Sequence, residues 1–578
     1  MNARAMRQRS GWIKIAAVMT SGLLVAGLFP PFGMGAMVWV ALMPMLAAVW
    51  SLAGRRAGWQ GFLLGWLAGT LSNVVQFSWL GIVSPLGLVV LPLYLGLYWA
   101  VFGAFAATLG NPWRATSTTT SNAVAIRRSL RVAICHGVLW AGLEWLRSWL
   151  FTGLGWNGLG VAFVDAPLMA QAADLLGITG LSIAPVFCQA VLVQAANRLR
   201  VNRRHGQYFA GLDCAIAAAV IGLLVVYGMA RLAIERRGEA VRLKTLLVQI
   251  NIPQDAAVVM WNALDVHLAY EEETRKALNN LTDKDPAHWP DWVMWPESAL
   301  TGRILRAADG TWGAWQENQD TIAQVRTAGS FQLLYGTNEL EAEHAADNQL
   351  VMKDNGRAWN SLAVMSPADD LQIYRKHHLV IFGETIPFVD TIPFLKKIYE
   401  QQAGVKYGGS FTPGDSFEPL SVPTASGTVI GAIPTICFED TVPRLTRRFV
   451  RPGPQVIVNV TNDGWFKQSA AAAQHFANAR FRAIELRRPL LRCANTGVSA
   501  AIDATGSTAH PDNGKPQVLL DGNGSQFTRG SLLTELRVRL QPTFSLYALI
   551  GDWGVITLAL LGLLWAWRTR PVTPEPGE

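Results

Sequence analysis

The sequence predicts two kinds of structure in one chain, a multi-pass α-helical membrane domain of about eight helices and one large α/β domain outside the membrane. Composition is the first observation: 51% of the 578 residues are hydrophobic, only 16% are charged, and 23 are tryptophan. Distribution is the second, because long apolar spans fill residues 1–233 and 544–578, whereas residues 234–543 have an ordinary globular composition. A chain of this length has room for two or more domains. We therefore predict membrane helices one to seven in 1–233, an outer domain in 234–543, and helix eight with a tail in 544–578.

The membrane helices are predicted from apolar segments. A membrane-spanning helix needs about 20 mostly apolar residues. The segment 57–109 has no charged residue and is too long for one span, and Ser84-Pro85 is a natural break within it. The candidate spans are 12–29, 34–52, two within 57–109, 132–150, 167–196, 214–230 and 544–567. The first is expected to be a retained helix, because no small-residue cleavage site follows it.

Arginines in the short loops predict the orientation. Cytoplasmic loops carry an excess of Lys and Arg, and every segment that lies inside when the N-terminus is inside is basic. These residues are Arg4, Arg7 and Arg9, then Arg55 and Arg56, then Arg114, Arg127, Arg128 and Arg131, then Arg198, Arg200, Arg203 and Arg204, and finally Arg568 and Arg570. The domain between spans seven and eight is therefore expected outside the cytoplasmic membrane.

The net charge of +8 does not predict a nucleic-acid partner. The basic residues cluster in short loops between apolar spans, where the membrane orientation accounts for them. A basic stripe interleaved with aromatic residues, which would favour nucleic-acid binding, is missing from the sequence. We expect no nucleic-acid partner.

Two features of the membrane domain have both a structural and a functional interpretation. Glu144 and Arg147 lie within the fifth span, where ionisable residues are candidates for function. They are three residues apart on a helix, so they could instead simply pair with each other. The segment from Thr152 to Asn157 follows, and its glycines and Trp156 predict a loop at the headgroup level that faces the large domain.

The outer domain alternates short apolar runs with helical segments, which indicates an α/β fold. The long segment 404–423 is rich in Pro and Gly and predicts an irregular loop, and loops of that length often act as lids. Predicted helices cover 267–278 and 470–486. Predicted strands cover 243–250, 292–295, 332–335, 361–365, 429–436, 456–460 and 498–502.

Cys437 ends the apolar run 429–436, and the carboxylates of Glu439 and Asp440 follow it. A thiol at the end of a buried strand lies at the edge of a sheet, where α/β enzymes usually place their chemistry. The structural alternative is an inert buried cysteine, because free Cys is among the most buried residue types. Cys493 is the other cysteine of the outer domain, and a Cys437–Cys493 disulfide would exclude a catalytic thiol.

Two further residues have the chemistry to act with Cys437. Glu297 follows the apolar run 292–295, and Lys376 lies in the segment YRKHHL. A carboxylate with a raised pKa can deprotonate a thiol, and an ammonium can stabilise the oxyanion that forms on an attacked carbonyl. The trio would then support acyl transfer through a thioester. Taken alone, a Glu or Lys is usually a solvated surface residue. The adjacent His377 and His378 would point in opposite directions on one strand and are interpreted as flanking structure, not as a metal site.

At these residues the sequence resembles a known family. The segments WPES, YRKHHL with FGE, and ICFED resemble the Glu, Lys and Cys motifs of the nitrilase, or carbon–nitrogen hydrolase, superfamily. The membrane spans and several further motifs narrow the resemblance, over nearly the full length, to the bacterial apolipoprotein N-acyltransferases. These motifs are VQINIPQ at 248–254 with Trp261, NDGWF at 462–466, Gln474-His475, Ala483-Ile484-Glu485 and Arg488-Pro489.

The resemblance implies a nitrilase-like α-β-β-α sandwich and a specific reaction. An acyl chain, typically the sn-1 chain of phosphatidylethanolamine, would move through a cysteine thioester to the α-amino group of the diacylglyceryl-cysteine that begins an apolipoprotein. Such an enzyme works by a ping-pong mechanism, without cofactor or metal. It would be a monomer in the bacterial inner membrane, with its catalytic domain on the periplasmic side.

Residue roles are implied by the same motifs. Glu297 would be the general base, Lys376 the oxyanion stabiliser and Cys437 the nucleophile. Supporting roles would belong to Glu384, Glu439 and Trp261, the last near the substrate entrance. The sequence departs from the family pattern at Phe438, where many members have Tyr, and at Ile381, where members commonly have Pro.

Two other functions remain open from the sequence. One is a membrane-anchored amidase or nitrilase that hydrolyses small C–N bonds, although an anchor would need only one span. The other is a transporter or assembly factor whose outer domain only binds, in which case Glu297, Lys376 and Cys437 would be dispensable.

Overall fold

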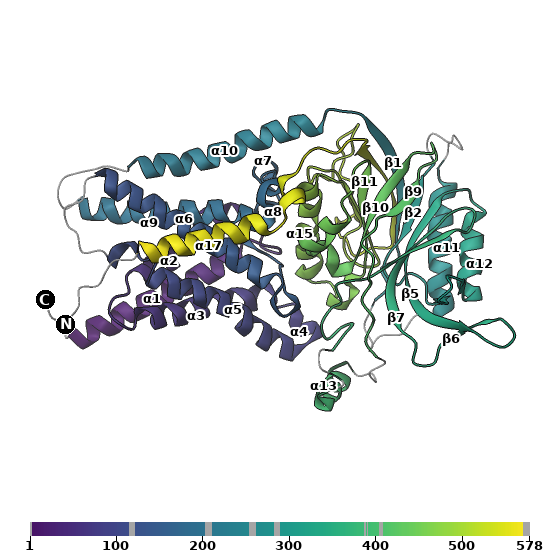
Figure 1. Cartoon of the computed structure of the whole chain (residues 1–578), viewed down its shortest axis with the longest axis horizontal. Helices are drawn as coiled ribbons and strands as arrows, with labels where there is room; N and C mark the ends of the chain where they lie inside the picture. Colours follow the sequence, from purple (N-terminus) through teal and green to yellow (C-terminus); the bar gives the residue numbers. More distant parts are fainter. Residues whose placement is uncertain are drawn as a thin grey trace. The chain divides into compact units, whose positions relative to one another are not determined.

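The computed structural model describes residues 3–114, 122–202, 211–253, 262–281, 289–386, 389, 391–403 and 409–569. The chain divides into two compact units (Figure 1). The first, which we call the helical unit, comprises Met1–Ile234 and Ser545–Glu578. The second, the sandwich unit, comprises Glu235–Phe544.

Helices occupy every predicted span of the helical unit, although three spans are broken, among them 544–567, which contains α16 and α17. The segment 34–52 forms a short 3-10 helix, Gly35–Trp39, followed by α2, and 167–196 contains three helices. A new helix starts at Pro85, as expected, with the Ser84 hydroxyl accepting a hydrogen bond from the Gly87 amide. The α-helices are α1 (Ala3–Ala26), α2 (Met43–Trp50), α3 (Ala57–Gln76), α4 (Leu80–Val83), α5 (Pro85–Ala107), α6 (Asn122–Arg147), α7 (Pro167–Ala170), α8 (Ala173–Leu181), α9 (Ile183–Asn202), α10 (Leu212–Glu235), α16 (Leu546–Ile550) and α17 (Trp553–Arg568).

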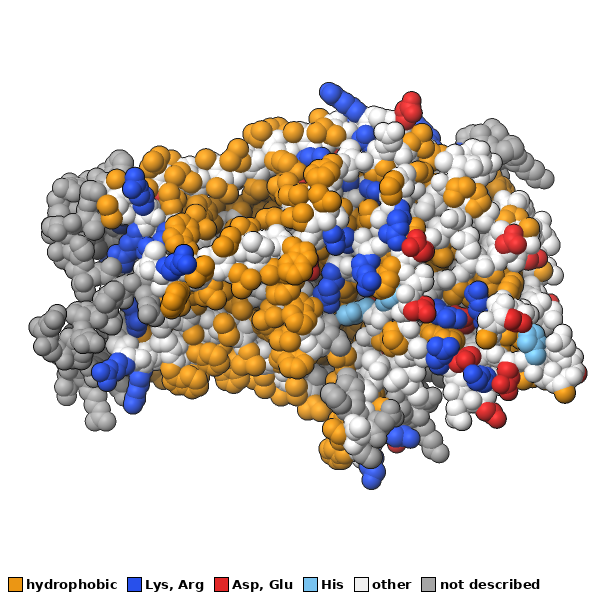
Figure 2. Space-filling model, in the orientation of Figure 1, with side chains coloured by type: hydrophobic (Ala, Val, Ile, Leu, Met, Phe, Trp, Pro, Cys, Tyr) orange, Lys and Arg blue, Asp and Glu red, His pale blue; other side chains and the backbone are white. Residues whose placement is uncertain are grey.

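Two of the described helices are long and apolar enough to cross a membrane on their own, Pro85–Arg114 and Leu212–Glu235. A third span results if Ala173–Leu181 and Ile183–Arg200, which meet at 55°, are counted as one. The count of eight spans stays a prediction. Hydrophobic side chains cover the face of the helical unit seen in Figure 2, and large apolar residues such as Leu223 and Leu561 are more than half exposed. Exposed apolar surface of this kind marks an interaction with a membrane or a partner.

Helices α3 and α5 approach each other closely through glycines. A Cβ atom on Gly61 would lie 2.4 Å from the carbonyl oxygen of Gly103, and one on Gly65 would lie 2.3 Å from that of Trp99. Gly61 and Gly65 are four residues apart and therefore share one face of α3. Small residues at such spacing allow two membrane helices to pack backbone against backbone.

The sandwich unit contains two sheets in its described part. The larger has nine strands with the central order β14-β1-β2-β5-β3-β4, and β7 joins β5 to β8. Strands β1, β2 and β5 are parallel, whereas β14 pairs antiparallel with β1 along its whole length. The strands are β1 (Ala240–Gln249), β2 (Trp292–Trp295), β3 (Arg303–Arg306), β4 (Trp312–Ala314), β5 (Gln332–His344), β6 (Leu350–Met352), β7 (Ala358–Met365), β8 (Leu371–Arg375) and β14 (Gly530–Arg539).

The smaller sheet has the order β13-β12-β11-β10-β9, and its three middle strands are parallel. Its face packs on the larger sheet: the Cys493 sulfur on β12 lies 3.4 Å from the carbonyl oxygen of Val248 on β1 and 3.3 Å from that of Met294 on β2. The strands are β9 (Leu420–Pro423), β10 (Val429–Ile436), β11 (Gln455–Thr461), β12 (Leu490–Ala494) and β13 (Ala500–Ile502).

Helices cover the outer faces of the two sheets (Figure 1). Helices α11 and α12 lie against the larger sheet and α15 against the smaller one. In α11, Val266, Ala269 and Tyr270 enter the core, and the Tyr270 ring lies 5.4 Å from the ring of Trp295 on β2. This packing fixes the end of β2. The helices are α11 (Ala263–Asn279), α12 (Gln316–Arg326), α13 (Pro393–Ala403), α14 (Pro443–Thr446) and α15 (Ala470–Leu486).

The α/β prediction is confirmed, and β2, β10 and α15 have the predicted bounds. The predicted loop 404–423 is wrong in its last four residues, which form β9 and pair antiparallel with β10; residues 404–408 lie outside the described residues. The predicted strand 332–335 is only the start of β5. The strand continues to His344, and its second half pairs with β3, β6 and β7 although its side chains have mixed polarity.

Candidate active site

Three strand ends bring together the side chains of Glu297, Lys376 and Cys437. Glu297 follows β2 by two residues, Lys376 directly follows β8, and Cys437 directly follows β10. The Lys376 Nζ atom lies 3.7 Å from Glu297 Oε1, and the Cys437 thiol hydrogen bonds to the Glu297 carboxylate. Glu297 is 9% exposed and Lys376 1% exposed, so this charged cluster is shielded from water.

The cluster is electrostatically coupled, and each pKa reflects its neighbours. Burial raises the pKa of the Glu297 carboxyl, while Lys376 opposes that shift. Burial alone would lower the pKa of the Lys376 ammonium, but the carboxylates of Glu297 and Glu384 raise it above its usual value. Burial and then Glu297 raise the pKa of the Cys437 thiol. The resting cluster therefore holds a thiol, a nearby base and a permanent cation.

Asn360 and Glu384 fix the polar ends of this cluster. Asn360, on β7, donates from Nδ2 to Glu297 Oε1 at 2.8 Å and to Glu384 Oε1 at 2.7 Å. Glu384 also accepts from Lys376 Nζ at 2.9 Å and from the Val380 amide at 2.9 Å. The two carboxylates are thus bridged by one amide and held on either side of the lysine.

Glu439 is fully buried and lies behind the cluster. Its carboxylate accepts hydrogen bonds from the Tyr374 hydroxyl at 2.8 Å and from the backbone amides of His377, His378 and Ile436 at 2.8, 2.9 and 2.9 Å. Burial raises its pKa to about 7, with Lys376 and these hydrogen bonds opposing the shift. Glu439 therefore ties the end of β8 to the end of β10, so that Lys376 and Cys437 keep their relative position.

Cys437 has a left-handed backbone conformation, with φ of 53°. Few residues other than glycine adopt such values, and they persist where surrounding contacts hold them. Asn459 on β11 provides one such contact, because its Nδ2 donates to the Cys437 carbonyl oxygen at 3.2 Å. Arg492 in turn donates to Asn459 Oδ1 at 3.0 Å. These contacts hold Cys437 in a sharp turn at the end of β10.

Behind Asn459 lies a buried network of two acidic and two basic side chains. His475 on α15 contacts Asp440 at 2.8 Å and Asp463 at 2.7 Å, and Arg492 contacts both carboxylates, lying 2.9 Å from that of Asp463. Burial and Arg492 would lower the pKa of His475, but Asp440 and Asp463 raise it to about 9. Buried charges are tolerated when they are paired in this way.

Several sequence predictions concern residues around the site. All five cysteines are free, and Cys493 points to the facing sheet, so the disulfide alternative is wrong. His377 and His378 lie after β8, stacked on Tyr374 and Phe438 respectively, and not on a strand. Trp261 lies outside the described residues. The described residues contain no group of three or more His, Cys, Asp or Glu side chains with metal-binding geometry.

In the helical unit, Glu144 and Arg147 do not form the ion pair that their spacing allows. Glu144 instead accepts hydrogen bonds from the Trp140 indole, the Leu159 amide and the Ser182 hydroxyl. Trp156 is buried in the helical unit at 3% exposure, with its ring 5.6 Å from that of Trp79. It is therefore a packing residue of this unit. The expectation that its loop faces the large domain stays a prediction.

Sequence reasoning missed Asn360, Asn459 and Arg492, and it assigned no role to Tyr374 of the YRKHHL segment. Asn360 and Ser361 interrupt a mostly apolar strand, and a buried amide in a strand is a signal of a hydrogen-bonding role. Asp463 and His475 stood within motifs of the resemblance, but the sequence did not indicate that they meet Asp440. Contacts between residues so far apart in the chain become visible only in the fold.

Two family models match parts of both units of the chain. The family model described as the apolipoprotein N-acyltransferase N-terminal domain matches residues 21–191, and the carbon–nitrogen hydrolase model matches residues 290–519. A glutamine-dependent NAD+ synthetase structure from Acinetobacter baumannii has a TM-score of 0.31 at 14% identity, covering 56% of this chain and 52% of that one. That likeness is too low to carry an argument.

Relatives match over most of the chain. The apolipoprotein N-acyltransferase of Geobacter metallireducens is 31% identical over 84% of this chain and 84% of its own length. Those of Bradyrhizobium diazoefficiens and Rhodopseudomonas palustris are each 30% identical, over 98% and 97% of this chain and 97% and 96% of their own lengths. On this evidence the chain belongs to the apolipoprotein N-acyltransferase family.

Proposed function

We propose that this protein transfers an acyl chain from a membrane phospholipid to the N-terminal amine of a lipid-modified apolipoprotein, which completes lipoprotein maturation. The observation that supports this best is the buried contact of Glu297, Lys376 and Cys437, because a base, a cation and a thiol are what acyl transfer through a thioester requires. The printed names of the relatives support the same reaction class.

In the first half-reaction, Glu297 takes the proton of the Cys437 thiol, and the thiolate attacks the ester carbonyl carbon of the lipid. Lys376 stabilises the negative charge that develops on the carbonyl oxygen. The ester C–O bond then breaks, and Glu297 returns the proton to the departing glycerol oxygen. A lysophospholipid leaves, and the acyl chain remains on the Cys437 sulfur.

In the second half-reaction, the neutral α-amine of the diacylglyceryl-cysteine attacks the thioester carbon. Glu297 accepts a proton from the attacking nitrogen, the C–S bond breaks, and the proton passes to the Cys437 sulfur. An amide is more stable than a thioester, so the transfer needs no external energy source. No cofactor or metal takes part in this scheme.

Supporting roles follow from contacts with the trio. Glu384 and Asn360 hold Lys376 and Glu297, and Glu439 holds the two strand ends together. Trp261 is proposed to lie at the substrate entrance, on the motif match alone. We propose the sn-1 chain of phosphatidylethanolamine as donor, on the same basis.

The membrane arrangement is also a proposal. The donor ester lies at the headgroup level, so the sandwich unit must be held at the membrane surface. Eight spans, with helices α10 and α17 flanking the sandwich unit, would hold it on the periplasmic side of the bacterial inner membrane. The basic loops support this orientation.

The deciding experiment is intact-mass measurement of the full-length protein after incubation with phosphatidylethanolamine. The wild type should gain one acyl mass that hydroxylamine removes, and Cys437→Ala should gain none. Cys493→Ala is the matched control, because it removes the other cysteine of the sandwich unit and should still be acylated. A wild type that is never acylated but releases ammonia from small amides would instead indicate a hydrolase.

A further inference from the structure

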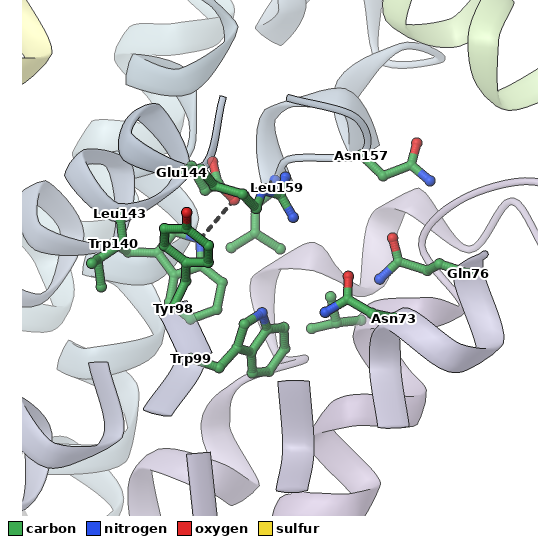
Figure 3. Close-up of a pocket in the computed structure, with 11 residues that line it drawn as sticks. Asn73, Gln76, Tyr98, Trp99, Trp140, Leu143, Glu144, Asn157 and Leu159 are labelled. Atoms are coloured by element: carbon green, nitrogen blue, oxygen red, sulfur yellow. Dashed lines mark hydrogen bonds between the residues drawn. The ribbon is translucent and has the colours of Figure 1, made fainter. Parts of the chain in front are cut away.

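A second pocket lies within the helical unit and shares no residue with the candidate active site. Its side chains come from α1, α3, α5 and α6 and from residues 157–159, and they surround a small hollow that is partly open (Figure 3). Asn73 and Gln76 reach the pocket from α3, Tyr98 and Trp99 from α5, and Trp140 from α6. The lining therefore combines amide and hydroxyl groups with aromatic rings.

Arg147 is the only cation that lines this pocket among the described residues, and its charge is not neutralised by a direct partner. Its side chain is 7% exposed. One terminal nitrogen, Nη2, donates to the Trp156 carbonyl oxygen at 2.9 Å. The Nε atom is buried and has no hydrogen-bond partner, and no ion pair joins Arg147 to a carboxylate in the described part of the chain.

Glu144, one turn earlier on α6, does not form an ion pair with Arg147. It also lines the pocket, but neutral donors already surround its carboxylate: the Trp140 indole at 2.8 Å, the Leu159 amide at 2.8 Å and the Ser182 hydroxyl at 2.6 Å. A dashed line in Figure 3 marks the first of these contacts. Glu144 therefore holds α6 to the segment that follows it. Its charge acts on Arg147 through space, but it forms no hydrogen bond with the guanidinium, whose N–H groups stay available.

A structural role accounts for part of the Arg147 side chain. It ends α6, where a cation is favoured by the helix dipole, and it fixes the Trp156 turn. That role uses one of its five N–H groups. A buried arginine whose Nε lacks a partner is costly, and in a membrane-protein interior such residues mark ligand sites.

We propose that this pocket binds the phosphate group of an amphiphile, with Arg147 as the recognising cation. A guanidinium binds phosphate through two parallel N–H donors, and the Nε edge of Arg147 is the edge left unused. The aromatic and aliphatic walls, including Trp99, Trp140 and Leu143, suit the hydrocarbon next to such a headgroup. A phospholipid and free phosphate share this chemistry, and the walls favour the phospholipid.

The proposal does not rest on the acyl-transfer reaction, and its test is a binding measurement. The full-length protein would carry Cys437→Ala, so that no acyl chain can move, and would be studied in a phosphate-free maltoside detergent. Native mass spectrometry would count bound dihexanoyl phosphatidylethanolamine, with dihexanoylglycerol as the probe that lacks phosphate. Calorimetric titration with sodium phosphate would test the free ion.

Arg147→Gln should lose one bound phospholipid, or weaken its binding at least tenfold, and should leave dihexanoylglycerol binding unchanged. Arg147→Lys keeps the charge but not the planar donor edge, and it should bind with intermediate affinity. Arg56→Gln removes an exposed arginine of the same unit and should bind as the parent does. Thermal unfolding of each variant reports whether it is folded.

The sodium phosphate titration shows whether the pocket binds free phosphate or the phosphate group of a phospholipid. Arg147-dependent binding of phosphate with the affinity of the phospholipid would support a site for the ion, and tighter phospholipid binding would support a headgroup site. Equal phospholipid counts and affinities in Arg147→Gln, Arg147→Lys and the parent would overturn the proposal. So would an equal loss of dihexanoylglycerol binding in folded Arg147→Gln.

Discussion

Asn360 donates a hydrogen bond from its side-chain amide to the carboxylate of Glu297 at 2.8 Å, in the shielded interior of the sandwich unit. This contact favours the ionised form of Glu297, against the effect of burial. The proposed base therefore depends on a residue that takes no part in the chemistry itself.

Asn360→Ala should move the acid limb of the pH–rate profile to higher pH. Hydrogen bonds to charged groups are worth roughly 1.5–3 kcal/mol, so the limb should move by about one to two pH units. The measurement is the rate of acyl transfer to a lipopeptide as a function of pH, from about pH 5 to about pH 9. Ser361→Ala, on the opposite face of the same strand, should leave the limb in place. A limb that stays unchanged in Asn360→Ala would show that Glu297 does not limit the rate.

Glu439→Gln should destabilise the sandwich unit. The carboxylate accepts four hydrogen bonds, and an amide nitrogen in its place would face backbone N–H donors. We expect a loss of about 3 kcal/mol, since each unsatisfied buried group costs roughly 1–3 kcal/mol, and a melting temperature lower by several degrees. Glu418→Gln, where the side chain is 75% exposed, should melt as the wild type does. Equal melting of the two variants would contradict the proposed tie between β8 and β10.

The stability of the sandwich unit should fall in alkaline solution because of His475. Its folded pKa of about 9 lies above its ordinary value of 6.5. The protonated form is bound more tightly by the folded state, so this stabilisation is complete below about pH 6.5 and is lost as the pH rises through about 9. The full effect is roughly 3 kcal/mol. Across this pH range the melting temperature should depend less on pH in His475→Gln than in the wild type. A dependence of the same size in His475→Gln would assign the effect to another group.

Gly103→Val should disrupt the packing of α3 on α5. Its Cβ atom would lie 2.2 Å from the carbonyl oxygen of Gly61, a backbone atom that cannot move aside locally. We expect a cost of about 3 kcal/mol, at the upper end of overpacking effects. Gly222→Val on α10 is the matched control, because nothing lies within 4 Å of its Cβ position. Detergent melting curves of the two variants, recorded side by side, provide the comparison; similar curves would argue against close α3–α5 packing.

The parts of the fold predictable from the sequence are those set by local pattern. β2 and β10 are largely apolar, mostly buried interior strands of their sheets, so their bounds could be read directly. β3, β4 and β6 are short strands with exposed or half-exposed side chains, and their sequences carry no comparable period. β3 and β6 pair with β5, and β4 pairs with β3, so only the fold reveals them.

The candidate site was predictable in its reactive groups and not in the groups that hold them. Glu297 and Cys437 stand out because each follows an apolar run, and Lys376 stands out through the motif resemblance. Asn360 and Asn459 are ordinary amides until the sheets bring them to the cluster. The spacing of Glu144 and Arg147 allowed an ion pair, but spacing shows only that two side chains share a face of the helix. In the fold, nearby neutral donors hydrogen bond to the Glu144 carboxylate instead.

The pairing of β1 with β14 makes the sandwich unit a cassette inserted between two helices of another unit. Ala240 pairs with Arg539, and the Leu540 amide bonds to the Glu239 carbonyl oxygen at 3.1 Å, so the chain enters and leaves this unit through adjacent strands. During synthesis β1 is exposed as an unpaired edge until β14 leaves the ribosome, after every other strand of the unit. A chaperone that covers an exposed strand edge during folding would therefore matter most for β1. The same geometry means that a linker of a few residues could replace the whole cassette and still join α10 to α16.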